Sequence, residues 1–363
     1  MKYLIILGDG MADWAVPALG NKTLLQYAHT PHMDRLARMG RTGMLRTVAD
    51  GFHPGSEVAN MSVLGYDLHE VYEGRGVLEA ANIGVDLAPD EIAARCNLVC
   101  IEGDILKNHS SGHITTDEAD VLIKYLQQHL GDERVRFHTG VQYRHLLVIK
   151  GGDKHLHCTP PHDVPLQPFR PLMVKAEVPE AQATADLVND LILRSQELLA
   201  KHPLNLKRIA EGKNPANCLW FWGEGRKPAL TPYKEKFGIE KGGVISAVDL
   251  IKGIGICAGL DVLNVDGNIT GTFETDYLAK AKTAIKAFED GYSFVYLHIE
   301  AADECGHHNQ LKEKIECIGD IDSKVIGPVM EYLENCGDDY SVLIMPDHPT
   351  PIKLKTHVSD PLL

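Results

Sequence analysis

Three short apolar runs in this chain are each followed at once by acidic or histidine residues, and this repeated pattern constrains the fold more than any other feature. Runs of this length, rich in aliphatic and β-branched residues, are typical of buried strands. Because ligands of open α/β sheets bind beyond the carboxyl ends of the strands, the pattern predicts that these polar residues share one site. The runs and the residues after them are 3–7 with Asp9, 294–299 with Glu300 and Asp303, and 341–345 with Asp347 and His348.

Helical patterns separate these runs along the chain. One apolar face lies within 187–199 and another within 277–288, each with apolar residues three or four positions apart. Strands that alternate with helices indicate an α/β fold with a mostly parallel sheet flanked by helices.

The middle of the chain follows a different pattern. A proline-rich stretch at 158–171 is predicted to be a linker. We therefore expect a smaller inserted α+β domain over 91–172, and a core domain made of 1–90 and 173–363. The elements predicted within the insert are strands at 96–102, 135–138 and 143–149 and one amphipathic helix at 118–130.

The composition argues against several classes of protein. The chain has 363 residues, with 36 Lys and Arg against 50 Asp and Glu, so its formal net charge is −14. This balance disfavours a nucleic-acid partner, which is gripped by clustered Lys and Arg. No apolar stretch reaches the roughly 20 residues of a membrane helix. The eight cysteines form no C-x-x-C pair, so we expect reduced thiols in a cytoplasmic protein with no membrane partner.

An Asp-x-x-x-His spacing provides the first candidate metal ligands. If one helix covers Asp303 and His307, their side chains share a face and can hold one cation. Asp347 and His348 are adjacent after an extended run, so they reach one ion only if the chain turns sharply there; His357 follows them. Mixed carboxylate and imidazole ligands suit Mn²⁺ or Zn²⁺, with Mg²⁺ and Co²⁺ as alternatives. The spaced pair alone is also typical of an ion pair on a surface helix.

Ser56 is the candidate nucleophile. Pro54 and Gly55 mark a helix start, and apolar residues at 58, 61 and 64 follow at helical spacing, which places Ser56 in the first turn. The free N–H groups of that turn favour an anion, including a phosphoryl group. Taken alone, Ser56 is more simply an N-cap. A pair of metal ions would supply the activation that a serine hydroxyl needs at neutral pH.

Seven sequence blocks give the chain a resemblance to a known family. The blocks are ILGDGMAD, PGSEVANMSVLGYD, YEGRGVLEA, TPPHD, DECGHH, PDH and KTHVSDP. They are similar to those of the archaeal-type cofactor-independent phosphoglycerate mutases of the alkaline phosphatase superfamily, over nearly the whole chain. The resemblance implies an alkaline-phosphatase-like core. It also implies metal-dependent phosphoryl transfer through a phosphoserine, which interconverts 3-phosphoglycerate and 2-phosphoglycerate in glycolysis and gluconeogenesis.

The resemblance further implies roles for individual residues and two divalent metal ions, with Mn²⁺ the first choice. Ser56 would accept the phosphoryl group, and the inserted domain would clamp the small phosphorylated substrate and exclude water. One ion would be held by Asp303, His307 and His357, and the other by Asp9, Asp347, His348 and the Ser56 hydroxyl. The candidate substrate grips are Arg75, His113, Arg144 and Arg226.

Other outcomes remain open at this point. The segment 109–113 lacks the arginine usual in the family, and a subgroup similar to these mutases has been proposed to act as homoserine kinases in threonine biosynthesis. Phosphomonoester hydrolysis is a third outcome of the same site, and a non-catalytic metal-binding protein is the alternative outside enzymes. We allow for a homo-oligomer. Because family members continue beyond residues 360–363 with a further strand and helix, we also expect a truncated chain.

Overall fold

The chain folds into two compact units. Its structure is a computed structural model that describes residues 1–362; Leu363, the last residue of the predicted core segment, lies outside them. Unit 1 comprises Met1–Tyr72 and Ala229–Leu363, and unit 2 comprises Glu73–Pro228. Unit 2 thus extends beyond the predicted insert at both ends. The stretch 158–171 lies inside unit 2 and does not link the two units.

Unit 1 is built on a five-stranded parallel sheet with the strand order β10-β9-β11-β1-β12. The three runs singled out in the sequence are the adjacent strands β11, β1 and β12. β11 is buried along its whole length and β1 over most of its length, as their apolar side chains predict. β12 is the edge strand, and only its last residue, Met345, is buried. Their bounds are β1 Lys2–Gly8, β11 Phe294–Ile299 and β12 Tyr340–Met345, with β9 at Gly242–Ile245 and β10 at Asp261–Val262. The predicted mostly parallel α/β architecture is confirmed for this unit.

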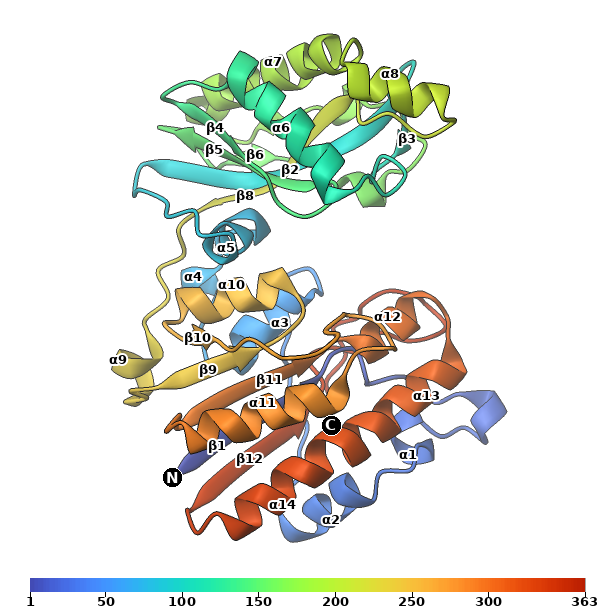
Figure 1. Cartoon of the computed structure of the whole chain (residues 1–363), viewed down its shortest axis with the longest axis vertical. Helices are drawn as coiled ribbons and strands as arrows, with labels where there is room; N and C mark the ends of the chain where they lie inside the picture. The colour runs from blue at the N-terminus through green and yellow to red at the C-terminus, as the bar shows by residue number, and fades with distance from the viewer. Residues whose placement is uncertain (363) are drawn as a thin grey trace. The chain divides into compact units, whose positions relative to one another are not determined.

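Helices α11, α13 and α14 cross one face of this sheet (Figure 1). They bury the alternate side chains Leu4 and Ile6 of β1 and Val295 and Leu297 of β11 in a continuous core. Two other helices of unit 1, α3 and α12, carry Ser56 and Asp303, respectively. The helices are α1 Leu24–Tyr27, α2 Pro31–Met39, α3 Ser56–Val63, α4 Leu68–Val71, α9 Tyr233–Phe237, α10 Asp249–Cys257, α11 Tyr277–Glu289, α12 Ala301–His307, α13 Leu311–Asp320 and α14 Gly327–Asn335, with a 3-10 turn η1 Pro17–Leu19 and a π-helical turn η5 Ile321–Ile326.

Unit 2 is an antiparallel α+β unit. Its sheet has the order β3-β2-β5-β4, and β8 also pairs with β2. Helices α6 and α7 cover one face of this sheet and α5 packs on the other (Figure 1). The elements are α5 Arg75–Asn82, β2 Glu91–Glu102, β3 Ile105–Asn108, α6 Thr116–Leu130, β4 Val135–His138, β5 Arg144–Lys150, β6 Leu156–His157, β7 Lys175–Ala176, α7 Gln182–Leu199, α8 Pro203–Ala210 and β8 Cys218–Arg226, with 3-10 turns η2 Pro161–Asp163, η3 Arg170–Leu172 and η4 Pro179–Ala181.

The boundary of unit 2 differs from the predicted one because an amphipathic helix does not reveal which sheet it covers. The apolar face of α7 was expected beside the parallel sheet. Its residues Val188, Leu191 and Leu199 are instead buried in the core that β2, β5 and β8 form. The strand β8 then closes the unit by pairing with β2 from Val99↔Cys218 to Ile92↔Arg226.

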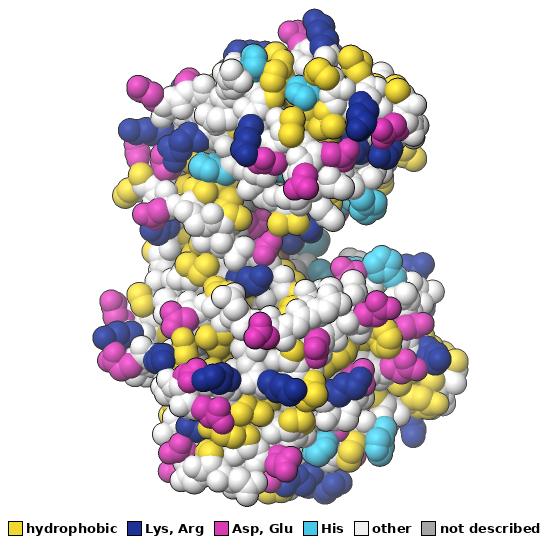
Figure 2. Space-filling view, viewed as in Figure 1, with side chains coloured by type: hydrophobic (Ala, Val, Ile, Leu, Met, Phe, Trp, Pro, Cys, Tyr) yellow, Lys and Arg dark blue, Asp and Glu magenta, His cyan; other side chains and the backbone are white. Residues whose placement is uncertain are grey.

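Two surface properties complete the description. Among residues 1–362, no helix is long and apolar enough to cross a membrane. On the face drawn in Figure 2, Lys and Arg side chains are interspersed with Asp and Glu over both units.

Candidate active site

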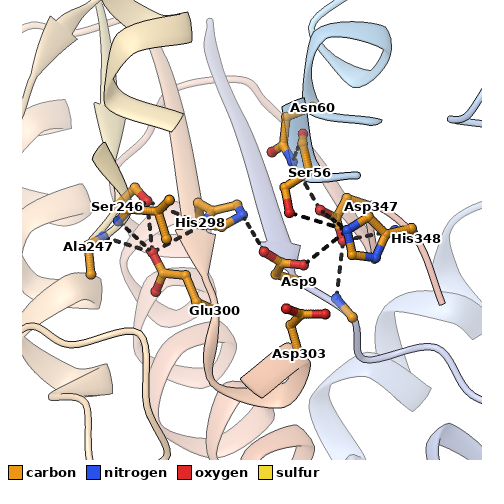
Figure 3. A network of polar contacts seen from close by, with 12 residues as sticks. Asp9, Ser56, Asn60, Ser246, Ala247, His298, Glu300, Asp303, Asp347 and His348 are labelled. Atoms are coloured by element: carbon orange, nitrogen blue, oxygen red, sulfur yellow. Dashed lines mark hydrogen bonds and ion pairs between the residues drawn. The ribbon is translucent and has the colours of Figure 1, made fainter. Parts of the chain in front are cut away.

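The carboxyl ends of three neighbouring strands meet at one place in unit 1. In the sheet register, Leu7 of β1 lies beside His298 of β11 and beside Met345 of β12. The N–H of Asp9 donates to the carbonyl oxygen of Ile299 over 2.9 Å, which continues the pairing past the strand ends. The residues that follow these strands are therefore neighbours in space, as predicted (Figure 3).

Asp303, His307 and His357 form the first group of side chains. Asp303 and His307 lie on one face of α12, with Oδ2 and Nε2 3.1 Å apart. The His357 Nε2 atom is 3.0 Å from His307 Nε2 and 3.4 Å from Asp303 Oδ1. Carbonyl oxygens of Lys355 and Pro54 approach the Nδ1 atoms of His307 and His357 at 3.0 and 3.4 Å. Because a carbonyl only accepts, each Nδ1 carries a proton, which leaves each Nε2 as the ring nitrogen that could bind a cation.

Asp9, Asp347 and His348 form the second group, together with Ser56. His348 Nε2 is 3.6 Å from Asp9 Oδ1, 3.4 Å from Asp347 Oδ2 and 3.3 Å from Ser56 Oγ. The chain bends at Asp347 and His348, where the His348 N–H donates to Asp347 Oδ1. This is the sharp turn that the adjacent pair needed in order to point at one place.

Ser56 is the first residue of α3, and Gly55 is the N-cap residue. Ser56 is therefore not the N-cap residue, and its hydroxyl faces His348 (Figure 3). One turn later, the Asn60 amide donates to Asp347 Oδ2 over 3.0 Å and to the Ser56 carbonyl oxygen over 2.8 Å. Asn60 thereby ties α3 to the end of β12.

The electrostatics of the site favour added positive charge. Burial raises the pKa of Asp9 well above its usual range, and the charges of Asp347 and Asp303 raise it further. Burial also acts to raise the pKa of Asp303, but His307 and His357 outweigh it and hold that pKa well below its usual value. Burial acts to lower the pKa of His307, and Asp303 outweighs it, which raises that pKa to about 9.

The residues fit a metal centre on structural grounds. Asp9 Oδ1 is buried and has no hydrogen-bond partner among the described residues, an arrangement that costs free energy unless a cation is bound. Two sets of side chains each offer ligand atoms within 4.8 Å of one another. The sets are Asp303, His348 and His357, and Asp9, His298 and Asp347. Carboxylate and imidazole donors of this kind suit divalent ions.

The predicted substrate grips all lie in unit 2. Arg75 Nε and Glu79 Oε1 are 3.1 Å apart on α5. Arg144 begins β5 and its guanidinium lies over the ring of Tyr143. His113 is exposed in the turn before α6. The Arg226 guanidinium donates to two backbone carbonyl oxygens, those of Pro89 and Gly152, so it ties loops of the unit together.

Sequence reasoning missed several residues that the structure brings to these places. In unit 2, Arg95 is buried between Glu79 and the ring of Trp222, and burial lowers its pKa to about 10. In unit 1, the Thr350 hydroxyl donates a hydrogen bond to Asp303 Oδ1. The backbone at Gly10 has φ +62°, and a Cβ there would lie 2.6 Å from the Asp303 Cα. Only Asn60 had a usable signal, because it lies four residues after Ser56 on the same helical face.

A parallel sheet that gathers three carboxylates and three imidazoles around a serine at a helix start defines an α/β enzyme built for metal-dependent phosphoryl transfer. A family model described as 2,3-bisphosphoglycerate-independent phosphoglycerate mutase matches residues 37–205. The chain is 47% identical over 363 residues to a protein of that name from Methanosarcina mazei, with 100% of this chain and 89% of that protein aligned. This chain belongs to the 2,3-bisphosphoglycerate-independent phosphoglycerate mutase family.

Further comparisons agree with this membership. A protein named as a probable mutase of the same kind, from Geobacter sulfurreducens, is 46% identical over 366 residues, covering 100% of this chain and 89% of that protein. A solved structure from Pyrococcus horikoshii matches with TM-score 0.81 and 31% identity, over 99% of this chain and 86% of the other. The cofactor-independent phosphoglycerate mutase from Thermoplasma acidophilum matches with TM-score 0.64 and 25% identity, over 100% and 88%.

Proposed function

We propose that this chain is a metal-dependent phosphoglycerate mutase that moves a phosphoryl group between the 3- and 2-hydroxyls of glycerate through a phosphoserine at Ser56. The observation that carries the proposal is the position of the Ser56 hydroxyl, 3.3 Å from His348 at the start of α3, among the converging carboxylates. Family membership supports the same reaction. The relatives carry the mutase name, so the homoserine kinase alternative is not favoured.

We propose two divalent ions at this site, with Mn²⁺ the first choice and Zn²⁺, Mg²⁺ and Co²⁺ as alternatives. Asp303, His307 and His357 would hold one ion, and Asp9, Asp347, His348 and the Ser56 hydroxyl would hold the other. The assignment is supported by the Nε2 atoms of His307 and His357, whose Nδ1 atoms are turned to carbonyl oxygens, and by the unpartnered Oδ1 of Asp9. When bound, such ions lower the pKa of a serine hydroxyl and neutralise the phosphoryl oxygens.

The protein's own residues then account for the transfer. Ser56 Oγ loses its proton and forms a bond to the phosphorus of 3-phosphoglycerate as the bond from phosphorus to the C3 oxygen breaks; the C3 oxygen takes up a proton, which leaves phosphoserine and glycerate. The bound glycerate turns, its C2 hydroxyl loses a proton and attacks the same phosphorus, and the bond to Oγ breaks as Oγ takes up a proton. The free N–H groups at the start of α3 favour the anion carried on Ser56. Asn60 holds that helix end against Asp347 throughout.

We propose that unit 2 binds the anionic groups of the substrate. Arg75, Arg95 and Arg144 lie near enough to one another that the charges of Arg75 and Arg144 lower the pKa of Arg95. Arg75 and Arg95 likewise lower the pKa of His162, after burial, which is the larger cause. This cluster offers several forked donors for a carboxylate and a phosphate. We assign Arg75 and Arg144 as the residues that bind the anionic groups of the substrate. The roles predicted for His113 and Arg226 stay predictions, as do the cytoplasmic location and a homo-oligomer.

The test compares the Ser56→Ala variant with the wild-type protein in the conversion of 3-phosphoglycerate to 2-phosphoglycerate after loading with Mn²⁺. We expect the wild type to be active and Ser56→Ala to lose at least about 10³-fold in kcat. Ser62→Ala, on the same helix, is the matched control and should retain activity. Phosphorylation of homoserine from a nucleotide without interconversion of phosphoglycerate would contradict the proposal, and so would an active Ser56→Ala variant.

A further inference from the structure

A buried chain of four side chains of alternating charge type ends at Asp9. Lys280 Nζ on α11 donates to Glu300 Oε2 over 2.7 Å. Glu300 Oε1 is 3.2 Å from His298 Nδ1, and His298 Nε2 is 3.2 Å from Asp9 Oδ2. Figure 3 shows His298 between the two carboxylates. None of these contacts was expected from the sequence.

All four side chains are removed from water. The side chains of Lys280 and His298 are 0% exposed, that of Glu300 is 4% exposed and that of Asp9 is 5% exposed. Charged groups at such depth are costly unless each has a partner of opposite sign. The alternation of basic and acidic groups provides a partner at every step. A buried arrangement of this kind is retained where it fixes a geometry that simpler packing does not.

Glu300 is the fixed point of the chain. Its Oε1 accepts hydrogen bonds from the Ser246 hydroxyl over 2.7 Å and from the backbone N–H of Ala247 over 2.8 Å and of Val248 over 3.2 Å. These donors follow β9, which pairs with β11. The carboxylate therefore has little freedom to move, and it locates the His298 ring at the end of β11.

We propose that His298 is a positioning residue that, held by Glu300 and Lys280, engages Asp9 Oδ2 and leaves Asp9 Oδ1 to bind metal. The two oxygens of Asp9 have different surroundings, as this division requires. Oδ2 forms an ion pair with His298 Nε2 at 3.2 Å, whereas Oδ1 is 3.6 Å from His348 Nε2. Among residues 1–362, Asp9 Oδ1 and His298 Nε2 both lack a hydrogen-bond partner. The inference rests on the metal site proposed above and adds to it a partner that none of the predicted ligands includes.

The main alternative is that His298 is itself a ligand, because its Nε2 lies within 4.8 Å of ligand atoms of Asp9 and Asp347. Positioning and ligation predict different results when His298 is replaced. If His298 only positions Asp9, its replacement weakens Mn²⁺ binding and leaves the number of bound ions unchanged at saturation. A ligand takes part in the coordination shell, so it contributes imidazole scattering to the metal's X-ray absorption spectrum.

The experiment measures Mn²⁺ affinity of the metal-free wild type, His298→Gln and Glu300→Gln by competition with a chromophoric chelator. We expect affinity at one of two sites to fall about 10- to 100-fold in both variants, with the stoichiometry unchanged at saturating Mn²⁺. The spectrum of the bound metal should show the same number of imidazole ligands in wild type and His298→Gln. Glu300→Gln keeps the side-chain shape, so it tests the proposal even if His298→Gln does not fold.

His145→Gln is the matched control, because His145 is also a buried histidine but lies in unit 2. It should leave Mn²⁺ affinity unchanged. Affinities of His298→Gln and Glu300→Gln within about threefold of wild type would overturn the proposal. Loss of one ion or of one imidazole scatterer in His298→Gln would overturn it in favour of ligation. A wild type that binds Mn²⁺ through Asp9 but does not convert phosphoglycerate would contradict the proposed function and leave this inference standing.

Discussion

At the scale of single residues, the site depends on groups whose charge the surroundings control. Burial lowers the pKa of His348. Burial acts in the same direction on His298, but Asp9 and Glu300 outweigh it and raise that pKa to about 10. The two histidines differ because hydrogen bonds to Asp9 and Glu300 raise the pKa of His298, whereas the neighbouring His357 and His307 add to the lowering of the pKa of His348 by burial. Contacts, and not residue type, decide which histidine holds a proton.

The pKa of His307 leads to a prediction for metal binding. Asp303 outweighs burial and raises that pKa from about 6.5 to about 9, so at neutral pH both ring nitrogens of His307 carry a proton in the metal-free protein. A metal ion must displace the proton on Nε2, so Mn²⁺ affinity should increase as pH rises from 6 to 9 and level off above. The stability of the metal-free fold changes with pH in the opposite direction. The ion pair of His307 with Asp303 stabilises that fold fully below about pH 6.5, and this contribution is lost as pH rises through about 9.

The measurement is a set of Mn²⁺ titrations between pH 6 and 10 with the wild type and two variants. His307→Gln should show a weaker pH dependence. His308→Gln, an exposed neighbour on the same turn, should behave as the wild type. Affinity that stays constant between pH 7 and 9 would contradict the prediction.

At the scale of elements, the start of α2 is completed by a residue far away in the chain. The Thr30 side chain makes no cap hydrogen bond at the start of α2. The carboxylate of Asp322, in the π-helical turn η5, instead accepts from the N–H groups of His32 over 3.1 Å and of Met33 over 2.7 Å. A π-turn places this side chain where a regular helix would not.

Replacing Asp322 with alanine should lower the free energy of unfolding by about 2 kcal/mol, because two N–H groups lose their acceptor at the positive end of α2. Urea unfolding followed by circular dichroism provides the measurement. Ser323→Ala, at the next residue, should change the value by less than about 0.5 kcal/mol. Equal stability of the two variants would show that α2 does not need this cap.

At the scale of the whole molecule, all the proposed metal ligands belong to unit 1, and the arginine cluster belongs to unit 2. Each unit has its own buried core. A ligand that binds only the folded form stabilises the part of the fold that it contacts, by about 2.7 kcal/mol at a hundred times its Kd. Metal binding should therefore stabilise unit 1 selectively.

Removal of metal with a chelator should abolish activity, and added Mn²⁺ should restore it. Hydrogen exchange should be faster without metal in β1, α12 and the segment 347–357, and unchanged in α6 and α7 of unit 2. In the Asp9→Asn variant, which lacks one proposed ligand, Mn²⁺ should slow hydrogen exchange in these segments less than it does in the wild type. Full activity after chelation, or equal protection of both units by Mn²⁺, would count against the assignment of the site.

The sequence by itself determined the site's main components. A buried strand and the polar residue that ends it are local patterns, so β1, β11, β12, the helical position of Ser56 and the pairing of Asp303 with His307 were all predictable. Parallel strands then bring their carboxyl ends together whatever lies between them. The sequence blocks around several of these residues gave the resemblance to the mutase family, and the 47% identity to a relative over the whole of this chain shows membership.

Only the tertiary structure decided which sheet α7 covers, which side chain completes α2, and that Lys280, Glu300 and His298 stand behind Asp9. Each of these depends on a contact between segments far apart in the chain, and the local sequence of one segment does not identify the other. A lysine on an amphipathic helix is expected to be solvated. Lys280 is buried because its ammonium group pairs with Glu300, which directly follows β11. Burial and partnership are properties of the packed molecule, so the local pattern could not contain them.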